Sequence, residues 1–139
     1  MKGIITALVG ILTVMVASGD AVTDLRPAIK EAAVQNGIDP VLMEAIIRLE
    51  SGHATSHAAR TKNNLAGIMG RKSLRSYASK EECIQHLGSI LAKYKAKGRV
   101  TVAQIGRVYS EARGVWTMRV NTCMGQIRSG RWGNIEIYN

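Results

Sequence analysis

Apolar residues recur at helical spacing along most of the chain, and helix-capping residues stand between these stretches. The clearest stretch begins with Asp39, a good N-cap, and Pro40, which suits a first helical position. We therefore expect a helix over residues 41–52. At about 100° per residue, Glu44 and Arg48 share one polar side of this helix.

Glu50 interrupts this pattern because it lies between apolar positions, one turn before the helix ends. A carboxylate there is either a buried partner for a cation or an acid whose pKa is raised for catalysis. Residues 51–78 follow without periodicity and contain several glycines and asparagines, which predicts a loop or a short β-hairpin. A loop directly after the acid suits the wall of a substrate cleft.

The other helices are marked by their caps. Thr23 or Asp24 is expected to cap a helix that ends at Asn36-Gly37 and packs against residues 41–52. Three later helices carry a row of apolar residues on one side. Two of them begin at the capping boxes Ser79/Glu82 and Thr101/Gln104, and the third carries Trp116, Val120, Cys123 and Ile127. Residues 131–139 are expected to form a strand or to pack on the core, so the pattern predicts a mostly α-helical protein.

The chain is long enough for one domain with a substantial core, since it has 139 residues of which 46% are hydrophobic. Its first residues differ from the rest: Lys2 precedes residues 3–17, which carry no charge, and small residues follow up to Gly19. This pattern predicts a secretory signal peptide over residues 1–19, because the apolar part is shorter than the roughly 20 residues of a membrane span. An uncleaved anchor that associates with the membrane through residues 3–17 and a buried core helix are the alternatives. We expect the domain over residues 20–139 to be exported.

Basic residues outnumber acidic ones by 19 to 10, which gives a formal net charge of +9. This charge favours an anionic partner: nucleic acid, lipid headgroups or a bacterial wall that carries phosphate polymers. Lysine and arginine are scattered without a dense basic run, so no nucleic-acid partner is expected.

Two cysteines, Cys83 and Cys123, lie on the apolar sides of predicted helices. A disulfide and two buried free thiols are both compatible with these positions. His53 and His57 are four residues apart, but Gly52 ends the helix before them and no second carboxylate is near. We therefore expect no metal ion and no other cofactor.

The candidate chemistry is narrowed by the motifs that are missing. The sequence has no glycine-rich phosphate loop, no serine nucleophile elbow and no zincin motif. What remains is Glu50, an embedded acid before a polar loop. This arrangement suits glycoside cleavage, in which a carboxylic acid kept protonated by apolar surroundings donates its proton to the leaving oxygen.

Three blocks of sequence resemble one family in order and spacing: Leu49-Glu50-Ser51-Gly52, Asn63-Asn64-Leu65-Ala66-Gly67-Ile68 and residues 75–82. They are similar to bacterial endo-β-N-acetylglucosaminidases of glycoside hydrolase family 73, which are peptidoglycan hydrolases of the lysozyme-like superfamily. The resemblance extends over residues 38–127. It implies a lysozyme-like α bundle with a loop or short β-hairpin after the catalytic helix, and an enzyme that acts on peptidoglycan glycan strands. We expect a monomer whose basic charge holds it beside anionic wall polymers.

The resemblance also implies roles for single residues. Glu50 would be the catalytic acid, and Tyr109 matches a tyrosine that lies near the cleaved sugar in such enzymes. The residues expected to shape the sugar site are Asn63, Asn64, Gly67 and Tyr77. From the residues alone, Asn64 is equally suited to capping a turn, and Tyr109 to the core.

A second carboxylate is the missing part of an ordinary two-acid mechanism. No Asp or Glu lies between Glu50 and Glu81, so Glu81, Glu82 and Glu111 are the candidates. Without a second carboxylate, two mechanisms are open. In one, the substrate's own acetamido group or a water attacks the sugar. In the other, the muramic 6-hydroxyl closes an anhydro ring as in lytic transglycosylases. The alternatives to a glucosaminidase are thus a transglycosylase and a non-catalytic wall-binding module of the same fold.

Overall fold

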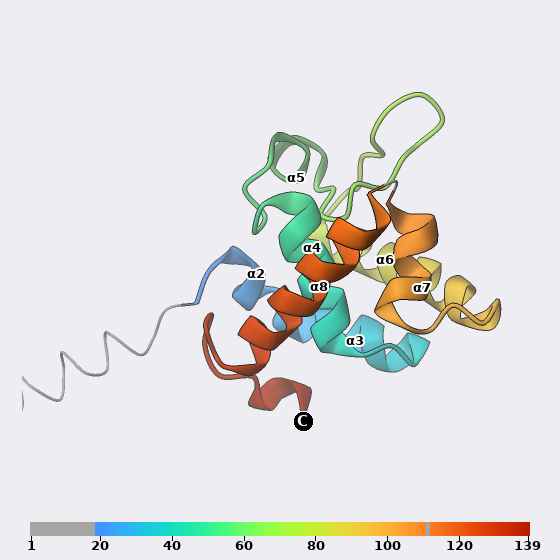
Figure 1. The fold of residues 1–139 in the computed structure, drawn as a ribbon. Helices are drawn as coiled ribbons and strands as arrows, with labels where there is room; N and C mark the ends of the chain where they lie inside the picture. Colours follow the sequence, from blue (N-terminus) through green and yellow to red (C-terminus); the bar gives the residue numbers. More distant parts are fainter. Residues whose placement is uncertain (1–18, 111) are drawn as a thin grey trace, which may run out of the picture.

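The computed structural model describes residues 19–110 and 112–139 (Figure 1). Nearly all of the predicted signal or anchor segment, residues 1–18, lies outside the described residues. The described elements are α2 (Ala21–Asp24), α3 (Arg26–Asn36), α4 (Pro40–Ser51), α5 (His57–Lys62), α6 (Lys80–Ala96), α7 (Val102–Tyr109), α8 (Arg113–Arg128) and the 3-10 helix η1 (Glu136–Tyr138). The predicted mostly α-helical, lysozyme-like fold class is confirmed. No helix in the described ranges is long and apolar enough to cross a membrane.

Helix α4 lies at the centre of the domain, where α3 and α8 pack against it (Figure 1). Its ends are those predicted: the Asp39 carboxylate accepts a hydrogen bond from the Val41 amide, and Gly52 ends the helix in the left-handed region at φ 55°. Only glycine adopts this conformation without steric cost. The expected packing of the preceding helix on this one is also confirmed.

The polar side of α4 faces the interior and not the solvent. The Glu44 carboxylate is completely buried, and it pairs with Arg26 of α3 at 2.7 Å and with Arg48 at 2.9 Å. Tyr138 of η1 donates a further hydrogen bond of 2.6 Å to Glu44. Arg48 also pairs with Asp20 at 2.6 Å. The buried ion cluster of α4 is therefore centred on Glu44.

The first predicted helix begins earlier than expected, and the prediction of its cap was wrong. Asp20 is the N-cap, because its carboxylate accepts a hydrogen bond of 3.0 Å from the Thr23 amide. The helix breaks after α2 at Leu25 and resumes as α3. Its predicted end is confirmed, with Gly37 in the left-handed region at φ 64°.

The later helices follow their predicted caps. The Ser79 hydroxyl accepts from the Glu82 amide at 3.1 Å, and Glu82 accepts in return from the Ala78 amide, one residue before the cap. Thr101 and Gln104 form a complete capping box at the start of α7. The apolar row predicted for α8 is buried along its whole length.

The region after α4 contains one helix that the sequence did not predict, α5, which is capped by Ser56. Six residues are too few for helical periodicity to be recognised. The predicted hairpin is reduced to a single antiparallel bridge between Met69 and Leu74. The loop that holds this bridge projects from the body of the protein between α5 and α6 (Figure 1).

Both cysteines are buried and free, which contradicts the disulfide alternative. The Cys83 sulfur accepts a hydrogen bond of 3.3 Å from the Leu65 amide, so its neighbour is the loop and not α8. The strand alternative for the last residues is also wrong, since they form η1 and pack on the core through Trp132, Ile135 and Tyr138.

Candidate active site

Glu50 lies at the end of α4 and is half-buried. Its Oε1 accepts a hydrogen bond of 2.9 Å from the indole nitrogen of Trp116, on α8. Burial raises the pKa of Glu50 above its ordinary value, while the Trp116 hydrogen bond acts in the opposite direction. The result is a carboxyl group that holds its proton to higher pH than an exposed glutamate.

The loop backbone passes directly beside this carboxyl group at Gly67. A Cβ atom at position 67 would lie 3.2 Å from Glu50 Oε2, and Gly67 has a φ of +64°. Both the close approach and the left-handed conformation favour glycine. Gly67 therefore leaves Glu50 Oε2 uncovered by any side chain from this point of the loop.

Asn64 holds the loop in this position and does not extend into an open site. Its side chain is buried; Oδ1 accepts from the amides of Ala66 and Ile68, and Nδ2 donates to the carbonyl oxygens of Ile68 and Arg75. These four bonds use both donor hydrogens and both acceptor lone pairs of the amide group. The alternative that Asn64 organises a turn is the one that its contacts support.

The Asn63 side chain also makes hydrogen bonds within the protein. It ends α5 in the left-handed region at φ 52°, and its Nδ2 donates 3.1 Å to the Tyr77 carbonyl oxygen. Its Oδ1 accepts from Lys80 Nζ at 3.1 Å. The contacts of Asn63 thus join the start of the loop to its end.

Tyr109 of α7 and Trp116 of α8 lie together beside Glu50 and the loop. Their rings stack with centroids 5.3 Å apart and an interplanar angle of 28°. The Tyr109 hydroxyl donates a hydrogen bond of 2.5 Å to the Ala66 carbonyl oxygen, next to Gly67. Burial and the nearby charge of Glu50 raise the pKa of Tyr109 well above its ordinary value, so its hydroxyl stays protonated. Through its stacking on Trp116, Tyr109 is linked to the hydrogen-bond donor of Glu50.

Two depressions border Glu50, Tyr109 and Trp116. One of about 240 Å³ contains Glu50 itself and is lined by Leu49, Glu50, Ser110, Ala112, Val115, Trp116 and Arg119. The other, of about 340 Å³, is lined by Ala66, Gly67, Ile68, Met69, Ile90, Tyr94, Val108 and Tyr109. Because Gly67 lines the second and adjoins Glu50 Oε2, the carboxyl group lies between the two depressions.

Tyr77 does not join this group in the structure. It is buried, its hydroxyl lies 2.6 Å from His86 Nδ1, and burial raises the pKa of Tyr77 to about 12. It lines neither depression. The contact of its hydroxyl with His86 connects the end of the loop to α6.

The two candidate second carboxylates that the structure describes, Glu81 and Glu82, line neither depression. Glu81 and Glu82 are exposed at the start of α6, where Glu82 accepts the Ala78 amide hydrogen bond. Glu111 lies outside the described residues. Within the ranges that the structure describes, Glu50 is the sole carboxylate that lines the two depressions.

The histidines after Gly52 have separate surroundings. His53 Nδ1 lies 3.0 Å from Arg48 Nη1, and its ring lies 5.2 Å from that of Trp132. His57 is exposed at the first position of α5.

Sequence reasoning missed Trp116 as the partner of Glu50. The sequence pattern places Trp116 in the apolar row of α8, which it does occupy. The available signal was its indole N–H, a donor that requires a partner when the ring is buried.

The comparison with protein families agrees with this architecture. The glucosaminidase family, described as mannosyl-glycoprotein endo-beta-N-acetylglucosaminidase, matches residues 26–126. The chain therefore belongs to the glucosaminidase family, family 73 of the glycoside hydrolases, as its sequence blocks predicted. This membership supports glycoside hydrolase activity. A search of curated proteins found no match.

Proposed function

We propose that this protein is an exported peptidoglycan hydrolase that cleaves the glycan backbone as an endo-β-N-acetylglucosaminidase, with Glu50 as the general acid. One observation carries the proposal: a half-buried carboxyl group with a raised pKa lies between two depressions, and the loop residue beside one of its oxygens is a glycine. Family membership supports the same class of reaction.

The two oxygens of Glu50 have different surroundings, which suggests how the proton is held. Oε1 accepts the Trp116 hydrogen bond, so Oε2 is the oxygen available to carry the acid proton. Oε2 is also the oxygen beside Gly67, where the loop residue carries no side chain. In the proposed reaction Oε2 protonates the glycosidic oxygen as its bond to the sugar breaks, and the substrate's own acetamido group or a water bonds to the anomeric carbon.

Tyr109 has a supporting part in this proposal. Its hydroxyl donates to Ala66 and its ring stacks on Trp116, so it links the loop to the donor that contacts Glu50. Beside the cleaved sugar, Tyr109 would fix the distance between the loop and the acid. The asparagines and Gly67 would then act on the sugar through the shape of the loop backbone.

Formation of an anhydro product, as in a lytic transglycosylase, is the second candidate. The observation that favours it is that no other carboxylate of the described ranges lines the depressions at Glu50. Glu50 would then act as acid and afterwards as base, while the muramic 6-hydroxyl attacks the sugar. A non-catalytic wall-binding module is the rival from a different class.

One digest of purified peptidoglycan, analysed by mass, tests these alternatives. A glucosaminidase releases fragments with N-acetylglucosamine at the reducing end. A transglycosylase releases fragments with anhydromuramic ends, which lack one water. Binding to peptidoglycan without any released fragment would overturn the enzymatic proposal in favour of the binding module.

Export and wall association complete the proposal. The substrate lies outside the cytoplasm, and the pattern of residues 1–19 is suited to a signal peptide or an anchor. A net charge of +9 would hold the protein on an anionic wall. This attraction should weaken as salt is added, because exposed charges are screened.

A further inference from the structure

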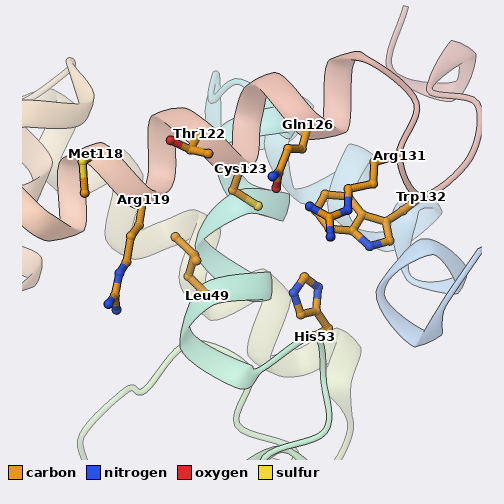
Figure 2. Close-up of a pocket in the computed structure, with 9 residues that line it drawn as sticks. All are labelled: Leu49, His53, Met118, Arg119, Thr122, Cys123, Gln126, Arg131 and Trp132. Carbon is orange, nitrogen blue, oxygen red and sulfur yellow. The ribbon is translucent and has the colours of Figure 1, made fainter.

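A larger cavity adjoins the site on the side of α8 and the residues that follow it. Its volume is about 480 Å³, and Figure 2 shows the nine residues that line it: Leu49, His53, Met118, Arg119, Thr122, Cys123, Gln126, Arg131 and Trp132. Two of these residues, Leu49 and Arg119, also line the depression that contains Glu50. A ligand at Glu50 can therefore continue into this cavity.

The charged residues that line the cavity are all basic. Arg119 and Arg131 are exposed, and no carboxylate of residues 19–110 and 112–139 pairs with either guanidinium group. The Arg131 guanidinium lies 5.0 Å from the centre of the Trp132 ring, which holds it at the edge of the cavity (Figure 2). Two unpaired cations beside a partly apolar floor suit a ligand that carries carboxylates.

Asp20, which lies beside His53, does not cancel this charge. Asp20 Oδ2 lies 3.9 Å from His53 Nδ1, but the same oxygen is already paired with Arg48 at 2.6 Å. Asp20 is not among the residues that line the cavity. The charged groups that line the cavity itself are therefore its arginines.

The cavity follows the axis of α8. Arg119 and Gln126 are both on this helix, and residues 119 to 126 rise by roughly 10 Å at 1.5 Å per residue. An extended peptide advances about 3.3 Å per residue, so roughly three residues span this length. The size of the cavity thus suits a short extended peptide better than a single ion.

We propose that this cavity binds the acidic peptide that branches from the glycan strand, with peptide carboxylates at Arg119 and Arg131. The inference rests on the proposed function, because it assigns the cavity to a second part of the same substrate. The glycan lies at Glu50, and the peptide crosses Leu49 to reach α8. Peptidoglycan that carries its peptides is then bound more tightly than a glycan from which they have been removed.

The test places one negative charge in the cavity without changing the shape of a side chain. Gln126→Glu does this on α8, and Asn121→Asp is the matched control, since Asn121 is exposed on the same helix and lines none of these cavities. The full chain is titrated by calorimetry with the peptide that an amidase releases from purified peptidoglycan. We expect Gln126→Glu to weaken binding about fivefold and Asn121→Asp to leave it unchanged. Equal affinity of wild type and Gln126→Glu, or no binding by wild type, would overturn the inference.

A digest separates this inference from the proposed function. Wild-type protein is given peptidoglycan with its peptides and the same glycan after amidase treatment. We expect a lower half-saturating concentration for the peptidoglycan that carries its peptides. Equal half-saturating concentrations for the two substrates would overturn the inference, while the glycosidase proposal stands. If neither glycan is cleaved, the proposed function fails, while peptide binding that is weakened by Gln126→Glu still supports an acidic-peptide site.

Discussion

The indole nitrogen of Trp116 lies 2.9 Å from Glu50 Oε1, and this hydrogen bond joins α8 to the end of α4 across 66 residues of sequence. It favours the charged form of Glu50, whereas burial favours the protonated form. The balance between these two effects sets the pH range in which Glu50 can act as an acid.

Trp116→Phe removes the donor and keeps an aromatic ring against Tyr109. Because the hydrogen bond lowers the pKa of Glu50, its loss raises that pKa further. We expect the basic limb of the kcat/KM profile against pH to move to higher pH. A limb that stays in place or moves to lower pH would contradict the assignment. The thermal unfolding midpoint, measured on the same samples, shows whether the variant is folded.

Gly67→Ala tests whether the loop residue beside Glu50 must lack a side chain. The new Cβ would lie 3.2 Å from Glu50 Oε2, at a backbone φ of +64°. We expect activity on peptidoglycan to fall by about 10- to 100-fold, since small displacements of reacting groups have large effects on rate. The left-handed conformation should also reduce the free energy of unfolding by about 1–2 kcal/mol.

Gly98→Ala is the matched control for this variant. Gly98 has a φ of +79°, but a Cβ there would meet nothing within 4 Å. It should lose similar stability and keep its activity. Equal activities of the two variants would show that contact with Glu50 is not what makes Gly67 necessary.

Tyr109→Phe tests the link between α7 and the loop. Without the hydroxyl, the carbonyl group of the buried Ala66 loses its donor, at a cost of about 1–3 kcal/mol. We expect urea unfolding at lower concentration and faster hydrogen exchange in residues 66–68. Unchanged stability and exchange would mean that Tyr109 does not hold the loop.

The ion cluster around Glu44 predicts a loss of stability in acid. Burial alone would raise the pKa of Glu44, but hydrogen bonds from Arg26, Tyr138 and Arg48 outweigh it and lower that pKa below 4.5. Burial likewise opposes the Arg48 and Thr23 hydrogen bonds that lower the pKa of Asp20 from 3.8 to about 2.

Both groups bind protons more weakly in the folded than in the unfolded chain, so their stabilising effect is complete above about pH 4.5. It is lost as the pH falls towards the folded-state values, near pH 2 for Asp20. We expect the thermal midpoint to drop between pH 4.5 and pH 2. Glu44→Gln should lower the free energy of unfolding by about 3–5 kcal/mol at neutral pH, because it removes the charged partner of two buried arginines. Glu31→Gln, at an exposed position of α3, should change neither the free energy of unfolding at neutral pH nor the drop of the thermal midpoint in acid.

Local signals in the sequence were sufficient to predict most helices. Asp39 and Gly52 fixed both ends of α4, and Ser79 and Thr101 fixed the starts of α6 and α7. Capping depends on neighbours within about four residues, so it can be recognised without a structure. The short α5 was missed because six residues are too few for periodicity to show.

Contacts between distant parts of the chain could not be predicted in the same way. Helical spacing showed that Glu44 and Arg48 share a side of α4, but not that α3 and the last residues cover this side. The buried ion pair with a cation that was considered for Glu50 is made by Glu44 instead. Glu50 was recognised as unusual, yet its partner Trp116 could be identified only when α8 was placed against α4.

The most direct test of the account is the release of soluble sugar fragments from purified peptidoglycan by Glu50→Gln. The amide keeps the shape of the side chain and cannot supply the acid proton, so the rate should fall at least about 100-fold. Glu81→Gln, a matched change at an exposed position, should act like wild type. Release by Glu50→Gln at the wild-type rate, from protein with an unchanged thermal midpoint, would contradict the assignment of Glu50 as the general acid.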